Sequence, residues 1–235
     1  MAFIQNGEFR EQGEKDKFFK LENDKDVKLV RFLHKDIQKV PVVTYHSINV
    51  DGYDRKVSCL RNYDEPLSKC PLCSKNDKYS SRKYLQLLVY ATDERGNPTG
   101  ATEVQVWDRG KRFVDKLDGI QRRLNAKGKN LCDVLFDIER IGKKGSTDTT
   151  YELYERTDLN SDNYPFELPT ELYNPIGKSI YDYNYDELVN VLNGKPAVDE
   201  GVEKREPVQQ NQPAQQPAVE EKRTEAEPVY TRRRL

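Results

Sequence analysis

Four residues have the types and spacing of a metal site: His46, Cys59, Cys70 and Cys73. The last two enclose the dipeptide Pro71-Leu72, and a C-x-x-C turn of this kind lets two thiolates face one ion. A structural zinc takes four nitrogen or sulfur ligands in a tetrahedron, which this set would complete. The ribbon between the ligands is too small to have a sufficient core of its own. We therefore predict one closed, structural zinc site.

Two other interpretations of these cysteines stay open: a redox dithiol, or ordinary buried thiols. A redox C-x-x-C needs a following helix N-terminus to lower the thiol pKa, whereas the polar residues 74–77 predict a turn. Cys132 differs from the other three because it alternates with apolar residues at 134, 136 and 138. It is expected on the buried face of a strand. His34 is the weaker histidine, since it ends a strand-like run far from the C-x-x-C.

Length and composition favour a soluble, intracellular protein. The 235 residues carry a formal net charge of -1, and no stretch approaches the roughly 18 apolar residues of a membrane span. The first residues have no apolar core of a signal peptide, so we expect neither secretion nor a membrane partner. Three cysteines assigned to metal and one buried thiol fit a reducing cytoplasm better than a disulfide framework.

Local patterns predict a mainly β protein in three parts. We expect an N-terminal arm over 1–20, a core over 21–195 and a disordered tail over 196–235, which is rich in Pro, Gln and Glu. Strands are predicted at 27–34, 40–48, 84–92, 103–107, 131–140 and 149–156. Helices are predicted over 113–124, from an apolar stripe, and over 185–192. These elements suit an OB-fold, a five- to six-stranded barrel with a few helices and a zinc-binding subdomain inserted at about 46–77.

Bases and aromatic rings together indicate a nucleic-acid surface. Residues 109–129 carry eight bases against two acids, the footprint of phosphate binding, although a solvated helix face is the alternative. Alternation places Tyr84 opposite the apolar side chains of its strand, and Trp107 opposite two valines. Exposed rings beside cations suit a single-strand binder, because bases stack on rings while cations follow the phosphates. Packing of both rings beneath a neighbouring segment is the other interpretation.

Taken in order over about residues 18 to 193, these motifs resemble a known family: the zinc-containing single-stranded DNA-binding, or helix-destabilising, proteins of large tailed bacteriophages. The series begins with Val30-Arg31-Phe32-Leu33, His46 and Cys59, and continues with Cys70-Pro71-Leu72-Cys73, Ser81-Arg82-Lys83-Tyr84 and Gly110-Lys111-Arg112. The resemblance implies an OB-fold with one structural Zn²⁺. It implies zinc ligands at His46, Cys59, Cys70 and Cys73, and a DNA cleft formed by Arg82, Lys83, Tyr84, Trp107, Arg109, Lys111 and Arg112.

The same resemblance implies a function. The protein would coat and protect single-stranded DNA without sequence specificity during phage DNA replication, recombination and repair, in the cytoplasm of the infected bacterial host. It would associate with itself along the strand and contact replication and recombination proteins through its C-terminal tail. The family's tail is acidic, whereas residues 196–235 hold eight acids and seven bases. The family's basic N-terminal arm also has no clear counterpart, since bases and acids are mixed over 1–20.

Two other classes of function stay open. A metal-dependent nuclease needs an open metal position or clustered carboxylates, and the chain has no H-E-x-x-H, P-loop or G-x-S-x-G motif. We therefore predict that the protein is not an enzyme. The second class is a zinc-ribbon protein-interaction module or transcription adaptor, which would bind a protein through the ribbon.

Overall fold

The computed structural model describes residues 17–50, 52–146 and 148–195. Most of the predicted arm and the whole predicted tail, 196–235, lie outside the described residues, so what the sequence predicts for them stays a prediction. Among the described helices, none combines the length and the apolar composition that a membrane span requires.

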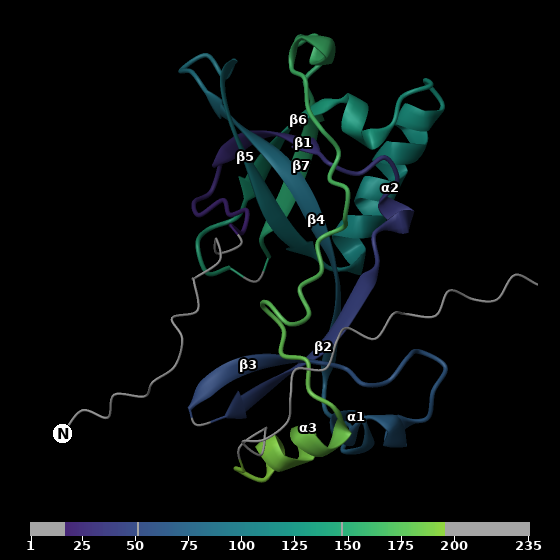
Figure 1. Cartoon of the computed structure of the whole chain (residues 1–235). Coiled ribbons are helices and arrows are strands. Elements are labelled where there is room, and N and C mark those ends of the chain that lie inside the picture. Colours follow the sequence, from purple (N-terminus) through teal and green to yellow (C-terminus); the bar gives the residue numbers. More distant parts are fainter. Residues whose placement is uncertain (1–16, 51, 147, 196–235) are drawn as a thin grey trace, which may run out of the picture. The chain divides into compact units, whose positions relative to one another are not determined.

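The described chain is mainly β, with a few helices (Figure 1). The strands are β1 (Val27–Phe32), β2 (Val42–Val50), β3 (Tyr53–Ser58), β4 (Tyr79–Thr92), β5 (Pro98–Arg109), β6 (Leu135–Ile141) and β7 (Thr150–Glu155). The α-helices are α1 (Pro71–Ser74), α2 (Lys111–Asn125) and α3 (Tyr185–Leu192). Short 3-10 turns cover Ile37–Lys39, Leu67–Lys69, Leu131–Asp133 and Ser161–Asn163.

The six predicted strands and both predicted helices are confirmed, with shifted ends. β3 was not predicted, because its middle residues Asp54, Arg55 and Lys56 are all charged. Residues 131–133 form a 3-10 turn instead of the predicted start of a strand. Cys132 is nevertheless buried, as expected, with 1% of its surface exposed.

All strand pairs are antiparallel, and β4 organises them. The first part of β4 pairs with β2, from Tyr79 to Lys83, and its second part pairs with β1, from Leu87 to Tyr90. Its opposite edge pairs with β5. The hydrogen-bonded order is β3-β2-β4-β1-β6-β7, with β5 beside β4. Within the described residues no pairing joins the two ends of this order, so the sheet is open and the predicted OB-fold barrel is not confirmed.

The main core lies between this sheet and α2. The apolar stripe of α2 contributes Val114, Leu117 and Leu124, which pack against buried residues of β1, β4, β5 and β6. A helix with one apolar face buries that face against a sheet, which places the bases of α2 on the other faces. The only tryptophan of the chain, Trp107, is part of this core.

A second, smaller region is called the metal module here: residues 46–77 together with α3. Its core consists of Ile48, Val57, Cys70, Leu72, Cys73, Leu188 and Val191, and α1 packs against α3. The module arises in the insertion between β2 and β4 that the sequence predicted, and α3 is added to it from the far end of the described chain.

The segment 157–184 connects β7 to α3 without a strand or an α-helix and crosses the outer face of β4 (Figure 1). Tyr173 donates its backbone N–H to Oε1 of Gln86 at 3.1 Å, and Tyr181 exchanges backbone hydrogen bonds with the edge of β3. Buried Arg31 holds the start of the segment by donating to the carbonyl oxygens of Ser161 and Tyr164. Around Tyr84 and Trp107, both faces of the β4–β5 pair are therefore covered, one by the main core and the other by this segment.

Candidate functional site

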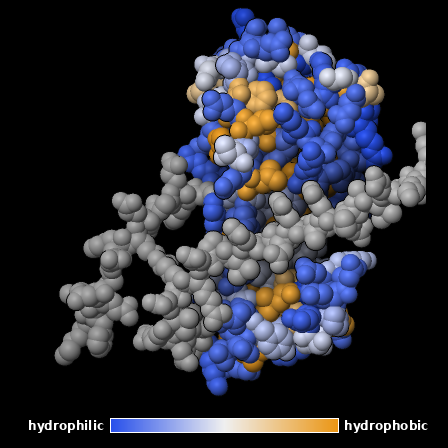
Figure 2. Space-filling model, turned by 45° about the vertical axis from the view of Figure 1, so that its right-hand side comes forward, coloured by the Kyte–Doolittle hydropathy of each residue, from blue (hydrophilic) through white to orange (hydrophobic). Residues whose placement is uncertain are grey.

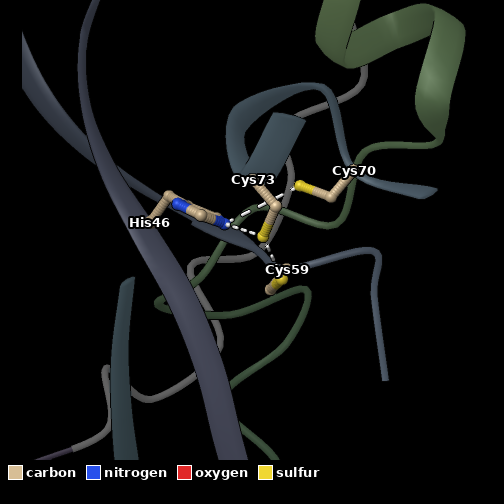
Figure 3. A group of neighbouring side chains, drawn as sticks. All are labelled: His46, Cys59, Cys70 and Cys73. Carbon is tan, nitrogen blue, oxygen red and sulfur yellow. Dashed lines mark hydrogen bonds between the residues drawn. The ribbon is translucent and has the colours of Figure 1, made fainter. Parts of the chain in front are cut away.

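The four predicted metal ligands come together in the metal module (Figure 3). His46 lies on β2, Cys59 follows the last residue of β3, and Cys70 and Cys73 lie at and inside the single turn of α1. The β2–β3 hairpin places His46 opposite Val57, which brings the histidine ring and the cysteine after β3 to the same side. Among the described residues, this is the one group of His, Cys, Asp or Glu side chains that can hold a metal ion.

The distances between the ligand atoms fit a tetrahedral zinc. Nε2 of His46 lies 3.7 Å from Sγ of Cys70 and 3.5 Å from Sγ of Cys73, and the sulfurs of Cys59 and Cys73 are 3.6 Å apart. Zinc bonds of about 2.3 Å to sulfur and about 2.0 Å to nitrogen give tetrahedron edges of about 3.5 to 3.8 Å. All four ligand atoms lie within 4.8 Å of one another. The donor set and its spacing therefore fit one four-coordinate ion.

A second layer of contacts orients the histidine. Its Nδ1 lies 3.2 Å from the carbonyl oxygen of Lys78, which can accept only if Nδ1 carries the proton. That tautomer leaves the Nε2 lone pair free on the side of the Cys70 and Cys73 sulfurs, the arrangement of a metal-bound histidine. Burial lowers the pKa of His46, which favours the neutral ring that a metal requires.

The thiols have unequal surroundings. Burial, first of all, raises the pKa of Cys59 to about 12. Burial also opposes ionisation of Cys70, but the backbone N–H groups of Cys73, Leu60 and Leu72 outweigh it and lower the pKa of this thiol. A bound cation would favour the thiolate at every ligand position. Cys70 and Cys73 are almost completely buried, whereas Cys59 is half-buried.

The chain around the C-x-x-C has a compact local structure. Cys70 is the N-cap residue of α1, and Pro71 occupies the first helical position. Proline suits this position, because the backbone N–H that it lacks would have no partner within the helix. The helix ends at Ser74, and Asn76 has a positive φ of 57°, so the predicted turn after the C-x-x-C is confirmed. The single helical turn over 71–74 was not predicted, because four residues carry no periodic signal.

Four of the seven residues assigned to a DNA cleft line one cavity of about 540 Å³, called the basic cleft: Arg82, Arg109, Lys111 and Arg112. They come from three elements, since Arg82 lies on β4, Arg109 ends β5 and the other two begin α2. Lys116 joins them, and Glu152 is the one acid that lines the cleft. The remaining lining residues are Ser80, Ser81, Gly110, Phe113, Thr149, Thr150 and Tyr151.

Arg109 has the most constrained position in the basic cleft. Its guanidinium lies 4.0 Å from the ring centre of Trp107 and 4.3 Å from that of Tyr151. Burial lowers the pKa of Arg109, although an arginine remains charged at neutral pH. The guanidinium therefore separates the Trp107 ring from the cleft and presents a fixed positive charge there instead.

The other three predicted cleft residues do not line the basic cleft. Lys83 is 7% exposed, and its Nζ donates to the carbonyl oxygen of Ile37 at 2.7 Å. Tyr84 and Trp107 are 2% and 1% exposed, so the prediction that their rings are exposed is wrong. In this conformation neither ring has a face on which a base can stack.

The register explains this error. Leu85 pairs directly with Trp107, and directly opposed residues share a face, so Trp107 points into the main core with Leu85. Tyr84 is on the other face, where Tyr173 and Ile180 of the connecting segment cover it. Alternation within one strand shows which residues share a face, but it does not show which face is covered by other parts of the chain. Packing beneath a neighbouring segment, the other interpretation of the rings, holds for Tyr84.

Only half of the eight bases in residues 109–129 lie at the basic cleft. Arg109, Lys111, Arg112 and Lys116 line the basic cleft, whereas the later four do not. The wall formed by residues 149–152 was missed, since the sequence predicts these residues only as the start of a strand and does not indicate that they face the bases. Figure 2 shows hydrophilic residues over most of the visible described surface, with small hydrophobic patches between them.

Neither a protein-family model nor a curated protein sequence matches this chain.

Proposed function

We propose that this protein binds single-stranded DNA without sequence preference. The observation that carries the proposal is the convergence of Arg82, Arg109, Lys111 and Arg112 on one cleft from three separate elements. Such a cluster attracts phosphates whatever the base sequence, because phosphate contacts carry no sequence information. The surface pair of Lys111 with Asp115 is weak and can be exchanged for a phosphate contact.

The proposal includes a structural zinc and an OB-like arrangement. His46, Cys59, Cys70 and Cys73 would hold the ion, which would stabilise a module whose small core includes two of its own ligands. The strands β5, β4, β1, β6 and β7 follow one another around the main core, and the rings of Trp107 on β5 and Tyr151 on β7 approach to 5.2 Å. This proximity favours a partly open barrel, the architecture that OB-folds use for oligonucleotides.

The biological setting of the proposal follows the resemblance to the helix-destabilising proteins of tailed phages. The protein would coat and protect single strands during phage DNA replication, recombination and repair, in the cytoplasm of an infected bacterium. Its partners would be single-stranded DNA, further copies of itself along the strand, and replication and recombination proteins that bind the tail. No enzymatic step is part of this role.

The test is binding of a dye-labelled oligothymidylate, followed by fluorescence anisotropy over a series of salt concentrations. We expect Arg112→Ala to weaken binding and to reduce the salt slope by about 0.7, the value for one phosphate contact on a single strand. Arg123→Ala is the matched control, since this exposed base lies on the same helix but outside the basic cleft. Equal affinity for duplex and single strands, or an equal loss in the control, would contradict the proposal.

A second candidate function is a protein-interaction module or transcription adaptor built on the zinc site. The exposed side chains of Tyr63, Leu67 and Tyr79 on and beside the metal module favour it, since apolar surface of this kind commonly serves protein contacts. The anisotropy experiment separates the two candidates, because an adaptor of this kind has no reason to bind oligothymidylate.

A further inference from the structure

A second groove, of about 870 Å³, lies beside the basic cleft and was not predicted from the sequence. It is lined by the start of the described chain at 18–22, by the beginning of β3, by the end of β5 and by residues 140–145. Arg109 and Tyr151 line both cavities, so the two cavities adjoin at these side chains. A ligand that fills the basic cleft would enter this groove if it were long enough.

The lining of the second groove has the chemistry of a single-strand site. Its bases are Lys20, Arg55, Lys56, Arg109, Arg140 and Lys144, against the acids Glu22, Asp54 and Asp108. Arg140 is already used within the fold, because it donates to the carbonyl oxygens of Leu21, Gly142 and Lys143. Leaving Arg140 aside, five bases against three acids still give the groove a net positive lining, which favours phosphates.

Two aromatic side chains at this groove are exposed, in contrast with Tyr84 and Trp107. Tyr53 is 71% exposed at the first residue of β3, and Tyr181 is 47% exposed where the connecting segment joins the β3 edge. Tyr181 is stacked on Tyr183 with ring centres 5.6 Å apart, which fixes its orientation. Exposed aromatic rings are suitable platforms for bases.

The contact that now occupies Tyr181 is weaker than the one a base would make. The guanidinium of Arg55 lies 5.5 Å from the ring centre of Tyr181. A cation–π contact at an exposed site contributes about 0.5 to 1 kcal/mol, whereas a stacked base contributes about 1 to 3 kcal/mol. A base can therefore displace the guanidinium, which is then free to contact the adjacent phosphate.

We infer that the second groove is a continuation of the single-stranded DNA path, in which Tyr53 and Tyr181 stack on bases beyond those held at the basic cleft. The inference rests on the proposed function and adds to it the residues that stack. The basic cleft supplies the phosphate anchor, Arg109 and Tyr151 form the junction, and the second groove supplies the stacking that the buried rings of Tyr84 and Trp107 do not.

The experiment compares an oligothymidylate of about 4 nucleotides with one of about 12, which lie within the range of site sizes of single-strand-binding folds. The wild-type protein should bind the longer strand more tightly. Tyr53→Ala and Tyr181→Ala should each weaken binding of the longer strand by about 5- to 150-fold, the range that 1 to 3 kcal/mol gives. Their affinity for the shorter strand should change much less, because the shorter strand can remain at the basic cleft.

Tyr53→Phe and Tyr181→Phe keep the ring and should keep wild-type affinity, which separates stacking from loss of the hydroxyl. Tyr63→Ala is the matched control, because Tyr63 is 90% exposed on the metal module and lines neither cavity. If the wild-type protein binds DNA but both alanine variants bind the longer strand as the wild type does, the path is wrong and the proposed function stands. If the wild-type protein binds neither strand, the proposed function fails and the path fails with it.

Discussion

The metal module and the main core are stabilised in different ways. The main core buries a continuous apolar set from four strands and α2, including Phe32, Leu85 and Phe136, and needs no ligand to do so. The apolar core of the metal module consists of seven buried residues, of which Cys70 and Cys73 are also predicted metal ligands. A small module with so few apolar residues would depend on a bound ion, whereas a large apolar core is stable by itself. Removing the metal should therefore affect the two regions very differently.

The same contrast applies to what the sequence reveals. The metal site is encoded by residue type and spacing, and a C-x-x-C with one further cysteine and a histidine has few alternative uses. The lining of a cleft depends on which face of each strand is covered, and that depends on segments far away in the chain. All four predicted ligands come together, whereas the exposure predicted for two rings is wrong.

The largest expected effect is loss of the metal through Cys73→Ser. We expect zinc content to fall from one ion per chain to nearly none, because three ligands no longer close the tetrahedron. Binding free energies of structural zinc reach about 10 to 16 kcal/mol in zinc-finger peptides, so the metal module should unfold. Amide hydrogen exchange should show lost protection in β3, α1 and α3, and retained protection in β1 and β6.

Elemental analysis measures the metal directly, and Cys132→Ala is the matched control. Cys132 is buried outside the metal module, so this variant should keep one zinc per chain. Unchanged metal content in Cys73→Ser would contradict the assigned ligand set. Loss of exchange protection in β1 together with β3 would show that the two regions unfold as one, and would contradict the comparison.

The second expected effect concerns the main core. Trp107→Ala should lower the free energy of unfolding by about 3 to 5 kcal/mol, the usual cost of removing a large buried aromatic side chain. The ring contacts Phe19, Phe113 and Tyr151, with centres between 4.7 and 5.2 Å apart, so a cavity would remain. Urea unfolding measures the change, and Trp107→Phe should cost less. A fully stable Trp107→Ala with weakened DNA binding would favour the exposed ring that the sequence predicted.

Particular residues show how far the sequence can predict this fold. The apolar stripe on α2 and the alternation of apolar residues at 134, 136 and 138 identify buried residues, because apolar periodicity is a local property. The sequence did not predict β3, because its middle residues are charged and give no apolar pattern. Only the structure shows that this segment pairs with β2. Likewise, nothing near Tyr53 or Tyr181 indicates that the two are neighbours of one groove, since more than a hundred residues separate them.

The third expected effect is a pH dependence that arises outside the metal module. Burial lowers the pKa of His34 to about 4, and Nε2 of its ring accepts the backbone N–H of Gln86 at 2.8 Å. The unfolded chain would protonate this histidine near pH 6.5, so the unfolded state binds more protons between about 6.5 and 4. The stability that the neutral ring provides is complete above about pH 6.5. It is lost progressively as the pH falls toward 4, by about 3 kcal/mol at most.

The measurement is urea unfolding of the wild type and of His34→Gln at a series of pH values, with the difference between the two proteins taken at each pH. The difference removes the contribution of acid-induced metal loss, which both proteins share. We expect the wild type to lose stability relative to His34→Gln as the pH falls from 6.5 to 4. A constant difference would show that His34 titrates alike in the folded and unfolded states, and would contradict its burial as a neutral ring.

The smallest expected effects come from two adjacent bases on β4, Arg82 and Lys83, which the sequence assigned to one cleft. Arg82 lines the basic cleft, whereas the Nζ of Lys83 donates to the carbonyl oxygen of Ile37 inside the fold. Arg82→Met should weaken binding of single-stranded DNA and reduce its salt slope by about 0.7, with little change in stability. Lys83→Met should leave DNA binding nearly unchanged. It should lower the free energy of unfolding by about 1 to 3 kcal/mol, because the carbonyl of Ile37 loses its charged donor.

Both Arg82→Met and Lys83→Met remove one positive charge and keep a long apolar side chain, so each is the control for the other. Urea unfolding gives the stability of each variant, and anisotropy with labelled oligothymidylate gives its affinity and salt slope. Long-range electrostatics alone would weaken DNA binding equally in both variants, because their charges are one residue apart. If Arg82→Met loses only affinity and Lys83→Met loses only stability, Arg82 faces the ligand and Lys83 faces the interior. If Lys83→Met loses affinity at unchanged stability, Lys83 belongs to the cleft as the sequence predicted, and its hydrogen bond to the carbonyl oxygen of Ile37 has to break when DNA binds.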